Sequence, residues 1–155
     1  MIINYLISNP RIEKESLNKQ ILNEIKKAKY SIWFANIWFS NKKLYQILMD
    51  KLDEGLNVEI LVNPNFISLN ENYLIQDFID NGGELYTLPY NNDTFFTNKY
   101  CIIDYSKVIS EDFKSEYSIK PNQGSAFIRE SDSTMLEHYI NDYMLLKNNY
   151  SINRY

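Results

Sequence analysis

Three residue types are scarce in this chain of 155 residues, which contains one cysteine, one histidine and four glycines. A single cysteine, Cys101, can form neither an intramolecular disulfide nor a thiolate metal cluster. The only histidine, His138, falls in the last predicted helix, where a polar-surface role is expected. No Ser–His–Asp or Cys–His nucleophile is therefore predicted, and no glycine-rich phosphate loop is present.

Metal ions and cofactors are not expected either. A metal site would have to rest on carboxylates, and the acidic residues of the middle of the chain (Asp93, Glu111, Asp112 and Glu116) have no spacing that compels one. The sequence predicts no cofactor.

Long apolar runs are absent as well. No stretch approaches the roughly 18 apolar residues of a membrane span. The opening segment, MIINYLISNPRIEKES, lacks the basic start and the long apolar core of a signal peptide. We therefore expect a cytoplasmic protein without a membrane span, in a reducing compartment that suits a single cysteine. The length fits one domain, residues 1–155.

Charge is unevenly distributed along the chain, whose formal net charge is −4. Residues 1–51 carry 9 Lys/Arg and 4 Asp/Glu, a balance of +5, and residues 52–155 carry 7 and 16, a balance of −9. A solvated surface is the first interpretation of this asymmetry. A basic nucleic-acid patch or an acidic protein-binding surface are the alternatives.

Strand-like and helix-like segments alternate along the chain, which predicts an α/β fold with a mixed, mostly parallel sheet flanked by helices on both faces. The predicted strands are 2–7, 31–39, 58–62, 84–88, 99–104, 107–109 and 124–129. Four helices are predicted: one after Ser16, one around residues 44–52 closed by Gly55, one ending at Gly82-Gly83, and one from Asp132 or Ser133.

The informative segment is Thr97-Asn98-Lys99-Tyr100-Cys101-Ile102-Ile103-Asp104. With histidine in place of Thr97, it would read H-x-K-x4-D. This spacing, with the strands SIWFAN and VEILV before it and Val108-Ile109 after it, resembles the phospholipase D-like (HKD) phosphodiesterase and nuclease family. The resemblance runs from about residue 16 to residue 147 and implies a three-layer phospholipase D-like domain carrying a single motif.

The family mechanism, as the resemblance implies it, needs two such motifs. A histidine attacks phosphorus to form a phosphohistidine, while lysines and small polar residues bind the phosphate oxygens. The aspartate fixes a neighbouring histidine or lysine. A chain with one motif therefore normally works as a homodimer with a shared site.

Several positions depart from this pattern. Thr97 replaces the nucleophile, and its hydroxyl has no adjacent base. Ser110-Glu111 stands where the family has Gly-Ser, and the Asn-x-Glu pattern appears as Asn122-Gln123-Gly124. The acidic residues near the motif disfavour polyanionic DNA. Lys99 and Asn122 are left as candidate substrate-binding residues, and Asp104 can be a turn residue that bonds its own backbone.

Three hypotheses follow. The first is a catalytically degenerate domain that serves as a binding or assembly module and self-associates. The second is a subunit of a phosphodiesterase or nuclease whose partner, a second phospholipase D-like chain, supplies the histidine. The third is an acidic protein-binding protein of the inhibitor or immunity type. Nucleic-acid binding through the basic helices is a further alternative.

Overall fold

A single mixed sheet organises the part of the chain that the computed structural model describes, namely residues 19–36, 42–64, 72–89, 99–111, 126–130, 133–150 and 153–154. Seven strands form this sheet in the order β6-β5-β4-β1-β2-β3-β7. Their bounds are β1 Ser31–Ala35, β2 Asn57–Val62, β3 Glu84–Thr87, β4 Tyr100–Ile103, β5 Lys107–Glu111, β6 Ala126–Glu130 and β7 Asn153–Arg154. The predicted strand over residues 2–7 lies outside the described residues.

Parallel pairing is confined to the centre of the sheet, where β2 pairs with both β1 and β3. The other four pairings are antiparallel: β1 with β4, β4 with β5, β5 with β6, and β3 with β7. The mixed α/β sheet is confirmed, but its parallel share is smaller than the sequence predicted. The cause is visible between β4 and β5, which a three-residue turn joins too tightly for a parallel crossover.

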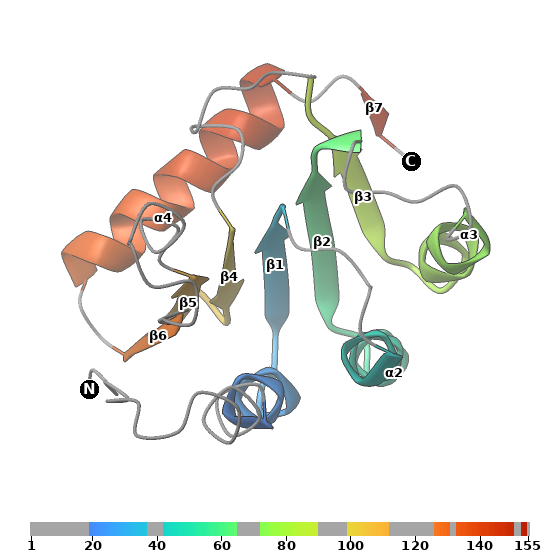
Figure 1. Cartoon of the computed structure of the whole chain (residues 1–155), viewed down its shortest axis with the longest axis horizontal. Coiled ribbons are helices and arrows are strands. Elements are labelled where there is room, and N and C mark those ends of the chain that lie inside the picture. The colour runs from blue at the N-terminus through green and yellow to red at the C-terminus, as the bar shows by residue number, and fades with distance from the viewer. Residues whose placement is uncertain are drawn as a thin grey trace, which may run out of the picture.

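Helices cover both faces of the sheet, which gives three layers (Figure 1). The helix over residues 19–26, α2 (Lys42–Asp53) and α3 (Asn72–Asp80) lie on one face. On the other face α4 (Ser133–Leu145) crosses the strands and continues into a π-helical turn, η5 (Leu146–Tyr150). None of the helices in the described ranges is long and apolar enough to cross a membrane.

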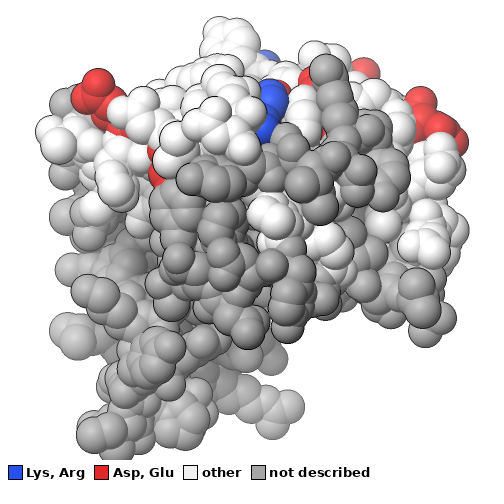
Figure 2. Space-filling model, turned by 90° about the horizontal axis from the view of Figure 1, so that it is seen from above, with Lys and Arg blue, Asp and Glu red and all other residues white. Residues whose placement is uncertain are grey.

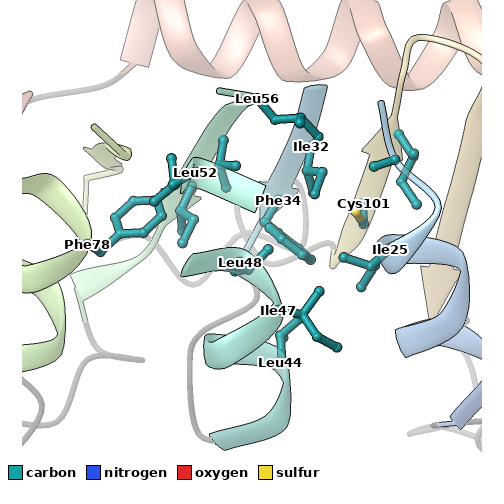
Figure 3. Packing of buried hydrophobic residues seen from close by; sticks show 14 of the residues in the cluster. Ile25, Ile32, Phe34, Leu44, Ile47, Leu48, Leu52, Leu56, Phe78 and Cys101 are labelled. Carbon is teal, nitrogen blue, oxygen red and sulfur yellow. The ribbon is translucent and has the colours of Figure 1, made fainter. Parts of the chain in front are cut away.

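Two apolar clusters, one on each face, hold the layers together. Ile32 and Phe34 of β1 meet Leu48 of α2 and Ile25 of the first helix in one cluster, as Figure 3 shows. Trp33 and its neighbours on the alternate positions pack under α4 in the other cluster. Because successive side chains of a strand face opposite sides, β1 is buried along its whole length, as a central strand must be.

Glycines end two helices as the sequence predicted. Gly55 and Gly82 adopt φ angles of 88° and 96°, in the left-handed region that follows a helix end. Gly83 has a different role, since a Cβ there would lie 2.3 Å from the ring of Phe78.

The predicted strand 31–39 is shorter than expected: β1 ends at Ala35, and residues 37–39 lie outside the described residues.

Candidate functional site

The motif segment begins at the edge of the sheet where β1 and β2 end. Ala35 pairs with Tyr100, and Tyr100 pairs with Ser110, so the end of β1, the start of β4 and the end of β5 meet there. Lys99, half-buried, stands directly before β4 and therefore lies at this edge. We call this the motif edge; among the described residues, Lys99 brings positive charge to it and Ser110 a hydroxyl.

Two asparagines at the motif edge had not been singled out from the sequence. Asn36 follows β1 and Asn63 follows β2, and their exposed fractions are 1% and 3%. Asn36 adopts a φ of 57°, a conformation that asparagine tolerates better than most residues. Its N–H donates to the Leu61 carbonyl at 2.6 Å, and its Oδ1 accepts from the Asn63 N–H at 3.2 Å. An asparagine directly after each apolar run was the signal available in the sequence.

Thr97 and Asn122 lie outside the described residues, as do Asp93, Asp112, Glu116 and Gly124. The backbone of Glu111 belongs to β5, but the structure does not describe its side chain. The place of Thr97 beside Lys99 and the contribution of Asn122 to the site therefore stay predictions.

Asp104 lies at the opposite end of β4. Ile103 pairs with Ile32, and the N–H of Asp104 donates to the carbonyl of Ser31 at the start of β1. Five residues of extended chain separate Asp104 from Lys99, which corresponds to about 16 Å. The Lys99 and Asp104 side chains, grouped by the motif, therefore do not meet in one site within this chain.

The carboxylate of Asp104 binds the backbone that leads into β1. It accepts hydrogen bonds from the N–H groups of Lys29 at 2.9 Å, Tyr30 at 2.7 Å and Ser31 at 3.0 Å. The sequence had predicted a bond to its own turn instead. Partial burial alone would raise the pKa of this carboxyl, but the three backbone bonds and the charge of Lys51 lower it below its usual value.

Lys51 of α2 binds the same stretch of backbone before β1. Its side chain is buried, and its Nζ donates to the Ala28 carbonyl at 2.9 Å and to Glu54 at 2.9 Å. At the corner between the first helix and β1, Asp104 thus accepts from the backbone N–H groups, and Lys51 donates to a backbone carbonyl. We call this arrangement the β1 corner clamp, and its role is to fix the central strand.

On the α4 side, Tyr100 connects the motif strand to the helix. Its hydroxyl donates to Asp142 at 2.6 Å, and burial followed by the Asp142 charge raises the pKa of Tyr100. Burial also raises the pKa of Asp142, against the opposing effects of Tyr100 and His138. His138, one turn earlier, is exposed on α4, with its ring centroid 5.7 Å from that of Tyr139.

Lys99 and His138, the histidine of α4, lie on different faces of β4. Strand alternation directs Lys99 to the same face as Cys101, away from Tyr100 and α4. Within the described ranges, no group of three or more His, Cys, Asp and Glu could hold a metal ion. Ser110 pairs with Tyr100 and therefore faces α4, so Lys99 and the Ser110 hydroxyl lie on opposite faces of the sheet.

On the face that carries the motif edge, the described acidic groups are separated from one another, and one small basic area lies among them (Figure 2). Many acidic side chains of the second part of the chain are engaged within the fold, namely Glu59, Asp77, Glu84, Asp104 and Asp142. The third hypothesis, an acidic protein-binding surface, stays a prediction.

Comparison with solved structures shows the same fold in several proteins. Nuc from Salmonella typhimurium, a phospholipase D family member, superposes with a TM-score of 0.70 over 89% of this chain and 90% of its own, at 17% identity. NucT from Helicobacter pylori gives 0.72 over 97% and 99%, at 16% identity. TrmBL2, described as an archaeal chromatin protein with a novel mode of DNA binding, gives 0.61 over 92% of this chain and 50% of its own, at 17% identity.

Comparison of the sequence with family models gives a match. No curated protein matches the chain significantly. The family model described as "Cardiolipin synthase, PLD-like domain" matches residues 21–111, which include the β1 corner clamp, the two edge asparagines and the motif from Thr97 to Asp104. The chain therefore belongs to the phospholipase D-like domain family.

Proposed function

We propose that this chain is a non-catalytic phospholipase D-like domain that acts in the cytoplasm as a self-associating binding module. The observation that carries the proposal is the threonine at position 97, where the family mechanism needs a nucleophilic histidine. A threonine hydroxyl requires a base, and the single histidine of the chain is exposed on α4, on the other face of β4 from Lys99.

The intact scaffold supports a retained role. The corner clamp fixes the start of β1, and the buried Asn36 and Asn63 fix the motif edge at its other end, although the nucleophile is absent from the sequence. The similarity to TrmBL2 supports a binding role, because that protein is described by its binding of DNA. At 17% identity this similarity concerns the fold, and the ligand of this chain is an inference of its own.

Hydrolysis is the first test. The purified chain, with no added partner, should not hydrolyse bis-p-nitrophenyl phosphate above the buffer rate, and Lys99→Ala should not change the result. Hydrolysis by the wild-type chain that disappears in Lys99→Ala would refute the non-catalytic assignment.

Self-association is the second test, and the β4–β5 hairpin offers a matched pair of variants. Ser110 lies at the motif edge and Ser106 in the turn at the opposite end. If two copies meet at the motif edge, Ser110→Arg should raise the dissociation constant of the dimer at least about tenfold, since it buries a charge without a partner. Ser106→Arg should leave it unchanged. Sedimentation equilibrium that finds only monomers of the wild type would contradict the proposal.

The retention of Lys99 favours a second candidate, a subunit that lends this lysine to a partner chain with an intact histidine. Co-purification with a His-containing phospholipase D-like chain, and phosphodiesterase activity of the mixture that requires Lys99, would favour this candidate. A chain that stays homomeric in the presence of such partners would dismiss it.

A further inference from the structure

A buried carboxylate lies beneath the C-terminal helix. Glu59 stands in the middle of β2 and is 4% exposed, although its strand neighbours are apolar. Its Oε2 accepts hydrogen bonds from the Lys147 ammonium at 2.9 Å and from the Tyr143 hydroxyl at 3.3 Å. A carboxylate at such depth is stabilised only by a matched cation and donors.

One aromatic ring lies over that ammonium, and further rings pack beside Tyr143. Lys147 Nζ lies 4.8 Å from the centroid of the Tyr86 ring. Trp33 stacks on Tyr143 at 4.9 Å, and the edge-on ring of Tyr105 lies 4.6 Å from Trp33. Rings around one carboxylate are the usual surroundings of a bound organic cation, because the ring faces attract positive charge.

Tyr105 combines an exposed side chain with an unusual backbone conformation. It is 52% exposed and adopts a φ of 53°, in the left-handed region that disfavours large side chains. Partial burial and then the negative charge of Glu59 raise the pKa of Tyr105, and the positive charge of Lys147 opposes this rise. Both members of the ion pair therefore act on the Tyr105 hydroxyl. Asp104 also has a φ of 53°, and positive φ angles at both central residues are what the tight β4–β5 hairpin turn requires.

The helix geometry at Lys147 is also unusual. α4 ends at Leu145, and the next five residues form the π-helical turn η5. π-helical turns are rare and are frequent at functional sites. Here Lys147 reaches across to Glu59, 88 residues away in the sequence.

We propose that Glu59, Tyr143 and Tyr86 form a primary-ammonium site, with Trp33 packed behind Tyr143, and that Lys147 occupies this site as a built-in ligand that fixes η5 to the sheet. The class of ligand is a protonated straight-chain amine. Stability alone does not account for the arrangement, since a well-packed apolar pair would stabilise the same contact as well or better.

Chemical rescue tests the site. Lys147→Ala retains Cβ and removes the atoms of an n-propylammonium ion. The variant should unfold roughly 10 °C below the wild type, because it leaves Glu59 without its cation. n-Propylammonium should raise the melting temperature of the variant by about 3 °C or more when its concentration exceeds the dissociation constant tenfold. The wild type, whose site is filled by the tethered lysine, should not respond.

A matched control separates the aromatic site from an ordinary ion pair. Lys107 and Glu24 form a pair of similar exposure, 17% and 15% against 19% and 6% for Lys147 and Glu59. Glu24 also pairs with Lys27, so the control is the double variant Lys27→Ala/Lys107→Ala, which leaves Glu24 without either cation. Rescue of this double variant as large as that of Lys147→Ala would overturn the proposal, and so would equal rescue of Lys147→Ala by 1-propanol.

A second variant covers the case in which Lys147→Ala does not fold. Lys147→Met fills the path of the side chain but removes the charge. Amide hydrogen exchange should then show about tenfold faster exchange in residues 146–150 than in the wild type, with the exchange of β5 unchanged. Exchange in residues 146–150 equal to that of the wild type would show that the ammonium does not latch η5, and would overturn the proposal.

Discussion

The β1 corner clamp provides the sharpest test of how this fold is held together. Asp104→Ala removes the acceptor of three backbone N–H groups, of which those of Lys29 and Tyr30 are exposed and that of Ser31 is part-buried. Charge-assisted bonds contribute about 1.5–3 kcal/mol each, but water can replace the acceptor for the two exposed donors. Alanine also tolerates the φ of 53° less well than aspartate. We expect a loss of about 3–4 kcal/mol in the free energy of unfolding.

Asp104→Asn keeps one acceptor and a residue that suits the left-handed conformation, so its loss should be smaller, about 1–2 kcal/mol. Urea unfolding at pH 7, followed by far-UV circular dichroism, measures both values. Asp53→Ala is the control, because Asp53 is the exposed last residue of α2 and its change should stay within about 0.5 kcal/mol. A loss below about 1 kcal/mol for Asp104→Ala would refute the clamp.

The clamp also predicts a dependence on pH. The pKa of Asp104 lies below its ordinary value of 3.8, so the folded state favours the ionised carboxylate. Its contribution is therefore complete above pH 3.8 and is lost as the pH falls through the lower pKa of the folded state. The stability difference between the wild type and Asp104→Asn should accordingly shrink as the pH falls below about 4. A difference that grows toward acid pH would contradict the assignment.

Three further predictions concern packing and chemistry. Gly83→Ala should lower the free energy of unfolding by about 2–4 kcal/mol, since the new Cβ would lie 2.3 Å from the buried ring of Phe78. No change in urea unfolding would contradict this packing. Tyr100→Phe should lower the free energy of unfolding by about 1 kcal/mol. It should also raise the pKa of Asp142 further, because it removes a hydrogen bond to the ionised carboxylate. Carboxyl NMR that shows a lower pKa of Asp142 would refute the contact. Burial raises the pKa of the Cys101 thiol, so a disulfide reagent should label it only in denaturant, and rapid labelling of the native protein would count against its burial.

Local residue chemistry was enough to predict much of the fold. Alternating burial requires a strand such as SIWFA to be apolar at every position, and the helix ends at Gly55 and Gly82 need the left-handed conformation that glycine adopts easily. The turn at Tyr105-Ser106 was placed correctly for the same kind of reason, because apolar runs flank a short polar segment.

The contacts that position the site could not be predicted in this way. Asp104 binds backbone groups 73 to 75 residues earlier in the chain, and Lys147 binds a glutamate 88 residues earlier. No local pattern encodes such partners, because each depends on which strands become neighbours. Motif spacing grouped Lys99 with Asp104, although an extended strand carries the two side chains to opposite ends of the sheet.

The position of β1 between β2 and β4 also bears on the order of folding. The pairing of β1 with β2 closes a short stretch of chain, from residue 31 to 57, whereas the pairing with β4 joins residue 32 to 103. The longer closure costs about 0.9 kcal/mol more in chain entropy, which favours early docking of β1, α2 and β2. The β1 corner clamp would then form after the rate-limiting step, so loss of the Asp104 carboxylate should accelerate unfolding and leave the folding rate nearly unchanged.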